Sequence, residues 1–193
     1  LDIDNDEFEM NFKSMFDTPW SFDSGRGRLA YGVGEDGISV ASGLIELLDG
    51  DLSAYGKLSM NLPSARELQT WGLTMGVADV ELLAADAYIP NSIPENLRSW
   101  IELAVKGGRS NEAGVTVHGA LFRGSPAVRK AHDLYLKVEN TEIEYHPDWP
   151  PATDLSATIH IDNHHVLTND ATGKVYSSDL ADVDVFVVIP DSG

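Results

Sequence analysis

Apolar and polar residues alternate along most of this chain of 193 residues. Near its start, for example, Phe8, Met10 and Phe12 are separated by single polar residues. Successive side chains of a β-strand point to opposite faces of a sheet, so a period of two predicts strands with one dry and one wet face. The most regular apolar positions, which we expect to share one sheet face, are Leu134, Leu136, Val138, Leu155, Ala157, Ile159, Ile161, Val183, Val185 and Val187.

Turn-forming residues separate these alternating runs. Their clusters lie at residues 34–37, 49–51, 140–141, 163–164 and 169–173. We also interpret Gly25, Gly27, Gly32 and Gly34, the last of which begins the 34–37 cluster, as turn residues at strand edges. A spacing of about 8 to 14 residues between turns predicts an antiparallel meander. We therefore predict a mainly β chain of about 12 to 15 strands, with residues 1–193 forming a single β-rich segment.

One segment follows a helical period instead. Ser92 and Glu95 form a capping box, Pro94 suits a first helical turn, and Gly107 can end a helix. The sequence therefore predicts one prominent amphipathic helix over residues 94–106. Its apolar face, which we expect to be buried, consists of Leu97, Trp100, Ile101, Ala104 and Val105.

The charge balance excludes several classes of partner. There are 13 Lys and Arg residues against 31 Asp and Glu, which gives a formal net charge of −18. Binding to nucleic acid and docking on anionic lipid head groups both need clustered basic residues, so neither is expected. The chain has no cysteine, which excludes disulfides and thiolate sites.

The sequence shows neither a membrane-spanning run nor a signal peptide. No run approaches the ~18 to 20 apolar residues that a membrane span needs, and the chain begins at Leu1 with an acidic stretch instead of a signal peptide. We therefore interpret the sequence as an internal piece of a longer chain. Any membrane anchor would lie outside it.

One cluster has the residue types of a metal site. If His160, Asp162 and His164 were all in a strand they would share a face, and imidazole and carboxylate are ligands for divalent transition metals. Alternation, however, places these three residues on the solvent side of a hairpin that turns at 163–164. We therefore predict an exposed hairpin tip, and no metal site formed by His160, Asp162, His164 and His165. No nucleophile elbow G-x-S-x-G and no ordered triad is present, and we expect neither enzymatic activity nor a cofactor.

The number of one-sided strands raises a packing problem. A single helix cannot cover so broad an apolar face. Either the sheet folds on itself and fills its core with side chains, or it curls into a trough whose dry interior holds something apolar. The alternation is the same in both cases, so the residues alone leave the two alternatives open.

Two passages carry a resemblance to a known family. The first is Ala87–Pro90 followed by the predicted helix with Ser99–Ile101 and Lys106–Gly108, and the second is Val138–Pro150, which ends in Y-x-P-x-W-P. Together they resemble the AsmA-like proteins of the YhdP type. Those proteins are large, periplasmic and anchored in the inner membrane, and they are implicated in moving phospholipid toward the outer membrane.

The resemblance implies a long curled antiparallel sheet, a groove or taco-like meander, whose hydrophobic interior shields phospholipid acyl chains. It implies that the partners are acyl chains and the rest of the same chain, that the location is the periplasm, and that there are no catalytic residues to carry over. The heavy acidity and the His160–His165 cluster depart from the family pattern. The alternative function is a closed β-sandwich that serves as a structural or protein-interaction module without a ligand.

Overall fold

The computed structural model describes residues 1–11, 16, 18–50, 52–83, 95–122, 131–144, 146–162 and 164–188. The predicted capping residues Ser92 and Pro94 and the passage Ala87–Pro90 lie outside the described residues. The side chains of Leu97 and Trp100 lie outside them as well.

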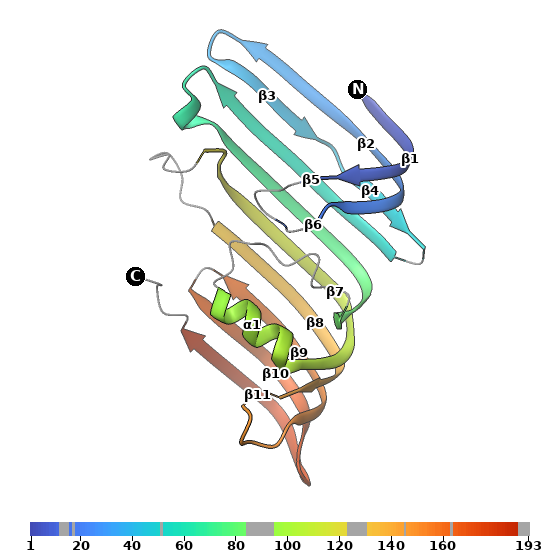
Figure 1. Ribbon diagram of the computed structural model, residues 1–193, viewed down its shortest axis with the longest axis vertical. Coiled ribbons are helices and arrows are strands. Elements are labelled where there is room, and N and C mark those ends of the chain that lie inside the picture. The colour runs from blue at the N-terminus through green and yellow to red at the C-terminus, as the bar shows by residue number, and fades with distance from the viewer. Residues whose placement is uncertain are drawn as a thin grey trace. The chain divides into compact units, whose positions relative to one another are not determined.

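The described elements are almost all strands (Figure 1). They are β1 (Asp2–Met10), β2 (Trp20–Gly34), β3 (Gly37–Ser42), β4 (Ile45–Asp49), β5 (Leu52–Pro63), β6 (Thr70–Glu81), β7 (Val105–Ala120), β8 (Ala131–Ile143), β9 (Ala152–Asp162), β10 (His165–Val175) and β11 (Ser178–Val188), with a 3-10 turn at Arg66–Leu68 and the helix α1 (Glu95–Ala104). They form one 11-stranded sheet in the order β1-β2-β3-β5-β6-β7-β8-β9-β10-β11, and β4 pairs with β2 and β5. The predicted mainly β antiparallel fold is confirmed.

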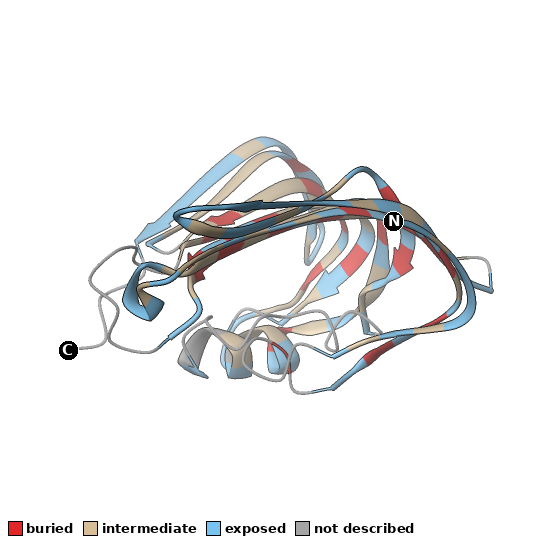
Figure 2. Cartoon of the chain, turned by 90° about the horizontal axis from the view of Figure 1, so that it is seen from above, coloured by how far each residue is buried: buried red, intermediate tan, exposed pale blue. Residues whose placement is uncertain are grey.

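The chain divides into two compact units, which we describe separately. The first unit comprises Leu1–Met10, Trp20–Val77 and Gly114–Asp133, and the second comprises Asn11–Pro19, Ala78–Ala113 and Leu134–Gly193. Strands β6, β7 and β8 therefore each contribute residues to both units. Within each unit, buried and exposed residues alternate along the strands (Figure 2), as the period-two pattern predicts.

In the first unit β2 pairs with β1, β3 and β4, and β5 pairs with β3 and β4. The β2–β3 hairpin turns between Gly34 and Gly37, as predicted. Gly25, Gly27 and Gly32 lie inside β2, which corrects their interpretation as turn residues at strand edges. The physical reason is close packing: a Cβ on Gly25 would meet the Phe8 ring at 2.6 Å, and a Cβ on Gly27 would meet Ile45 at 3.0 Å.

In the second unit β10 pairs with β9 on one side and β11 on the other. A hydrophobic cluster covers one face of these strands and of β8. Its buried members are Val138, Leu155, Ala157 and Ala171, with Leu82, Leu136, Ile143, Ile159 and Val183 packed around them in partly buried positions.

The predicted helix is present as α1, but it ends earlier than the sequence indicates. Val105 already belongs to β7, and Gly107 lies within that strand instead of capping the helix. The last helical turn joins the sheet where Glu144 N donates to Ala104 O at 2.8 Å and Lys106 pairs with Glu144 at 3.1 Å. Of the predicted apolar face, Ala104 is buried, whereas Ile101 and Val105 are partly buried.

Two predicted turns are wrong. Residues 140–141 lie inside β8, and residues 169–173 lie inside β10. Both segments contain a residue with left-handed backbone, Asn140 at φ 50° and Asp170 at φ 54°, a conformation that Asn and Asp tolerate in turns and bulges alike. The turn-forming residues therefore mark irregularities within long strands, which explains why the described strands are fewer than predicted.

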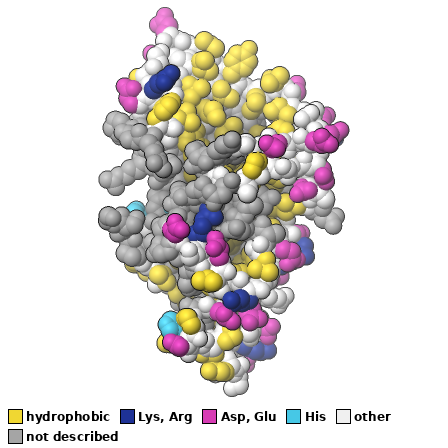
Figure 3. Space-filling model, in the orientation of Figure 1, with side chains coloured by type: hydrophobic (Ala, Val, Ile, Leu, Met, Phe, Trp, Pro, Cys, Tyr) yellow, Lys and Arg dark blue, Asp and Glu magenta, His cyan; other side chains and the backbone are white. Residues whose placement is uncertain are grey.

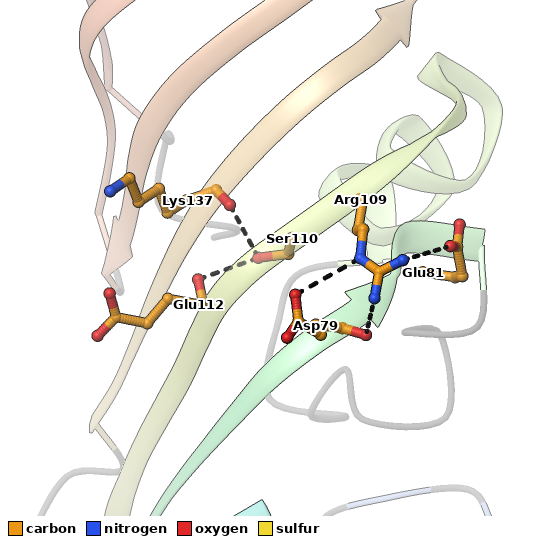
Figure 4. Close-up of polar contacts among 6 residues, drawn as sticks. All are labelled: Asp79, Glu81, Arg109, Ser110, Glu112 and Lys137. Atoms are coloured by element: carbon orange, nitrogen blue, oxygen red, sulfur yellow. Dashed lines mark hydrogen bonds and ion pairs between the residues drawn. The ribbon is translucent and has the colours of Figure 1, made fainter. Parts of the chain in front are cut away.

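A polar network ties β6, β7 and β8 together where they belong to the second unit (Figure 4). Arg109 lies 3.6 Å from an oxygen of Asp79 and 3.7 Å from one of Glu81. The adjacent hydroxyl of Ser110, which is fully buried, shares its proton between the carbonyl oxygens of Glu112 at 3.0 Å and Lys137 at 3.2 Å. A buried hydroxyl without such acceptors would cost about 1–3 kcal/mol.

Gly108 provides a stability test of this region. It has φ +121°, and a Cβ there would lie 2.7 Å from the Cα of buried Thr141, whereas a Cβ on Gly107 would meet nothing within 4 Å. We expect Gly108→Ala to lower the free energy of unfolding by about 2–3 kcal/mol. Gly107→Ala is the matched control and should change it little. Urea unfolding of both variants measures the difference, and equal stabilities would contradict the close approach of β7 and β8.

Candidate functional site

The strand register brings the predicted apolar residues of β9 and β11 onto one face. Across β9, β10 and β11, Ile161 is opposite Val166, which is opposite Val187. One step along, Ile159, Thr168 and Val185 form the next row. Residues opposite one another in adjacent strands share a face.

The predicted residues differ sharply in exposure. Leu134, Val138, Leu155, Ala157 and Ile161 are buried, and Val138, Leu155 and Ala157 belong to the hydrophobic cluster. The partly buried ones that pack against this cluster are Leu136, Ile159 and Val183. In contrast, Val185 is 45% and Val187 49% exposed. The face is therefore filled near the middle of the second unit and open at β11.

The first unit contains an open apolar face that the sequence reasoning did not single out. Strand pairing aligns two rows across β2, β3 and β5. The Tyr31 row is Tyr31, Val40 and Met60, and the Val33 row is Val33, Ile38 and Leu62. Tyr31 and Val33 are 73% and 74% exposed. Hydrophobic side chains gather over these strands in Figure 3.

These two rows continue a face that is buried elsewhere in the same unit. Along β5, Ala54 and Gly56 are buried, Leu58, Met60 and Leu62 are partly buried, and all five alternate with more polar residues. In the sequence these rows are indicated only by the alternation of apolar and polar residues at 38–40 and 58–60, and each of these runs is short. At Tyr31 and Val33 the adjacent Gly32 and Gly34 favour a turn, so the local sequence does not indicate a strand there.

Chemically, the two rows offer contact surface and no reactive group. None of their six side chains is an acidic residue, lysine, arginine or histidine. Contiguous exposed apolar patches on a folded protein mark sites for apolar ligands, membranes or other proteins. The arrangement can therefore hold apolar groups through burial alone.

Strands β9 and β10 form the predicted hairpin, but of the four cluster residues only His164 is exposed, whereas His160, Asp162 and His165 are partly buried. A single carboxylate oxygen of Asp162 accepts from the backbone N–H groups of His164 and His165, both at 2.7 Å. The His165 ring lies 3.1 Å from the other oxygen of Asp162. His160 instead contacts Tyr135 edge to face, with ring centroids 5.0 Å apart. Within the described residues, no three His, Asp or Glu side chains are grouped as metal ligands.

The turn also determines the electrostatics of Asp162. The hydrogen bond from the His164 N–H lowers the pKa of its carboxyl group below 3.8, and the contacts with His165 act in the same direction while partial burial opposes them. Asp162 thus stabilises the turn as a charged acceptor.

No helix in the described part of the chain is long and apolar enough to cross a membrane. A family model described as YhdP protein matches residues 1–193. No curated protein and no solved structure matches the chain.

The lowered pKa of Asp162 predicts a pH dependence of stability. Because the folded pKa lies below the unfolded one, the contribution of Asp162 is present above about pH 4 and is lost as the pH falls through the folded pKa. The carboxylate is about half exposed, so we expect Asp162→Ala to cost only about 0.5–1 kcal/mol at pH 7.

Urea unfolding between pH 7 and pH 2.5 measures this effect. The difference between Asp162→Ala and the natural chain should shrink toward low pH. Asp162→Asn, which keeps an oxygen acceptor without the charge, should fall between the two at pH 7. A difference that stays constant over the whole range would contradict the charged-acceptor role.

Proposed function

The chain belongs to the YhdP protein family, and from this premise we propose that it is a segment of a periplasmic lipid-transfer protein. In this proposal its apolar sheet face shields phospholipid acyl chains on their way between the inner and outer membranes. The chain would act without catalysis or cofactor. Contact with either membrane would be made by other parts of the full-length protein.

The observation that carries the proposal is the open apolar face of the first unit. Tyr31, Val33 and Ile38 are all exposed on one face of three paired strands. Covering such a surface with an acyl chain gains about 0.8 kcal/mol for each methylene removed from water. Ten methylenes therefore correspond to an upper bound of roughly 8 kcal/mol, enough to hold a chain out of water while leaving it free to slide.

The distribution of charge supports the same function. On β3 the apolar residues Ile38 and Val40 flank Ser39, which belongs to the opposite face together with Gly32 and Asn61. A charge within the apolar rows would have to be desolvated when an acyl chain passed, at a cost of several kcal/mol. Rows without ionised groups are therefore what an acyl-chain path requires.

The closed module is favoured by one observation, the packed cluster around Val138, Leu155 and Ala157 in the second unit. A sandwich, however, needs two sheets, and the described strands form one. The exposed Tyr31 and Val33 rows also have no role in a closed core. We therefore propose the conduit as the function and treat the closed module as the outcome that would replace it.

Photocrosslinking from adjacent residues tests which face meets lipid. A photoreactive amino acid at Ile38 or Ile159 of the full-length protein in cells should form adducts with phospholipid, because each position lies on the apolar face of its own unit. The same amino acid at the neighbours Ser39 or Thr158 should not. Mass spectrometry of the purified adducts gives the yield. Equal yields from both faces would exclude the conduit.

Charge substitution gives a functional counterpart. Ile38→Asp and Ile159→Asp should each impair outer-membrane integrity when the full-length variant is the only copy, because an unpaired carboxylate opposes acyl-chain passage. Ser39→Asp and Thr158→Asp should be nearly silent. Ile38 is already 44% exposed, so its substitution tests passage with little risk to folding. Full complementation by a normally folded Ile38→Asp protein would contradict the proposal.

A further inference from the structure

Successive strands of the second unit each contain one residue with left-handed backbone. Non-glycine residues in this conformation are uncommon, and Asp and Asn adopt it at the lowest cost. We name these residues, one on each strand from β6 to β11, the bulge line. They are Asp79, Gly108, Asn140, Asp154, Asp170 and Asp182, with φ between 50° and 121°.

The register shows that three of them accompany inserted residues. Between the pairs Asn169–Thr158 and Thr172–Ser156, β10 advances one residue more than β9, and Asp170 lies in that interval. In the next interval β9 instead advances one residue more than β10, and Asp154 lies within that interval.

The same happens on the other side of β10. Asp170 again lies in the interval where β10 gains a residue, and Asp182 lies where β11 gains one. Each insertion is therefore compensated by one in the neighbouring strand, so that pairing resumes in step. Val175 consequently lies opposite both Ala152 and Ser178.

Contacts connect the bulge line from strand to strand. Arg109, next to Gly108, lies close to Asp79, and a Cβ on Gly108 would collide with Thr141, next to Asn140. Farther along, Lys174 pairs with Asp154 at 3.2 Å. The backbone N–H of Asp170 donates to a carboxylate oxygen of Asp184, also at 3.2 Å. The irregularities thus follow one line across the unit.

The hydrophobic cluster lies along the same line. Leu155, Ala171 and Val183 each directly follow a bulge-line residue, and all three point to the apolar face in the cluster. In β8 the buried positions change from even to odd numbers across Asn140, from Val138 to Thr141. An inserted residue in left-handed conformation bends its strand and increases the local twist, and Figure 1 shows β8 and β9 curving along their length.

We propose that the bulge line bends strands β8 to β11 and thereby sets the shape of the apolar face in the second unit. The effect of this bent face on acyl chains rests on the proposed function. The bend itself is a property of the backbone and can be measured without lipid.

Spin-label distances along β10 test the bend. The chain has no cysteine, so His164→Cys and Tyr176→Cys, at exposed positions beyond the two ends of β10, would be the only labelled sites of this segment. A straight strand would separate these Cα atoms by about 40 Å, at ~3.4 Å per residue. We expect a shorter distance in the natural chain and in Asp170→Gly, since glycine adopts positive φ freely.

Asp170→Val should lengthen the distance toward that of a straight strand and lower the melting temperature by several degrees, because β-branched residues strongly disfavour positive φ. Thr172→Val, on the same strand at an exposed position outside the bulge line, is the control and should change neither. Should Asp170→Val fail to fold, Asp170→Ala takes its place, with a smaller shift in the same direction relative to Asp170→Gly. A folded Val or Ala variant with the natural distance overturns the proposal.

Lipid crosslinking from Ile159 in the same variants separates the two proposals. A lengthened distance together with reduced lipid adducts supports both. A lengthened distance with unchanged adducts supports the bend and shows that lipid contact at this face does not depend on it. An unchanged distance overturns the bend whatever the adduct yield, and the adducts then report on the proposed function alone.

Discussion

The alternation of side chains between the two faces of a strand is the constraint on which the rest of this structure depends. A slip of one residue moves every following side chain to the opposite face. In β9, β10 and β11 each added residue is matched by another in the adjacent strand. In spite of the insertions, the apolar residues of the three strands therefore share one face with Thr168 of β10. They are Leu155, Ala157, Ile159 and Ile161 in β9, Val166 in β10, and Val183, Val185 and Val187 in β11. Long strands can then bend without losing the dry face that they share.

The same constraint explains which parts could be predicted from the sequence. Uninterrupted alternation from Leu155 to Ile161 predicted the strand and its dry face correctly. At Asn140 and within 169–173 the sequence offered turn-forming residues, and a bulge requires the same left-handed conformation as a turn. The distinction depends on whether the neighbouring strand provides a compensating insertion, which is not visible in the local sequence.

Glycines were misinterpreted for a related reason. Gly25 and Gly27 are strand residues whose missing side chains make room for Phe8 and Ile45, and those partners come from other strands. The open rows around Tyr31 and Val33 were overlooked along with them. The end of α1 was placed too late because Val105 suits a helix face and a β-strand equally well. Its incorporation into β7 is decided by tertiary pairing instead of local propensity.

The acidity acquires a physical role from this architecture. An exposed apolar face makes a protein prone to self-association. A net charge of −18 opposes this, because copies of the chain repel one another. None of the acidic residues belongs to the two apolar rows. Asp2 and Asp4 lie on β1 at one edge of the described sheet, paired with Arg28 and Arg26, where charge opposes pairing with a further strand. Others, such as Asp154 and Asp170, occupy positions where the backbone must turn left-handed. The acids thus serve both solubility and bending, and each of these uses keeps charge off the surface on which the proposed acyl-chain path depends.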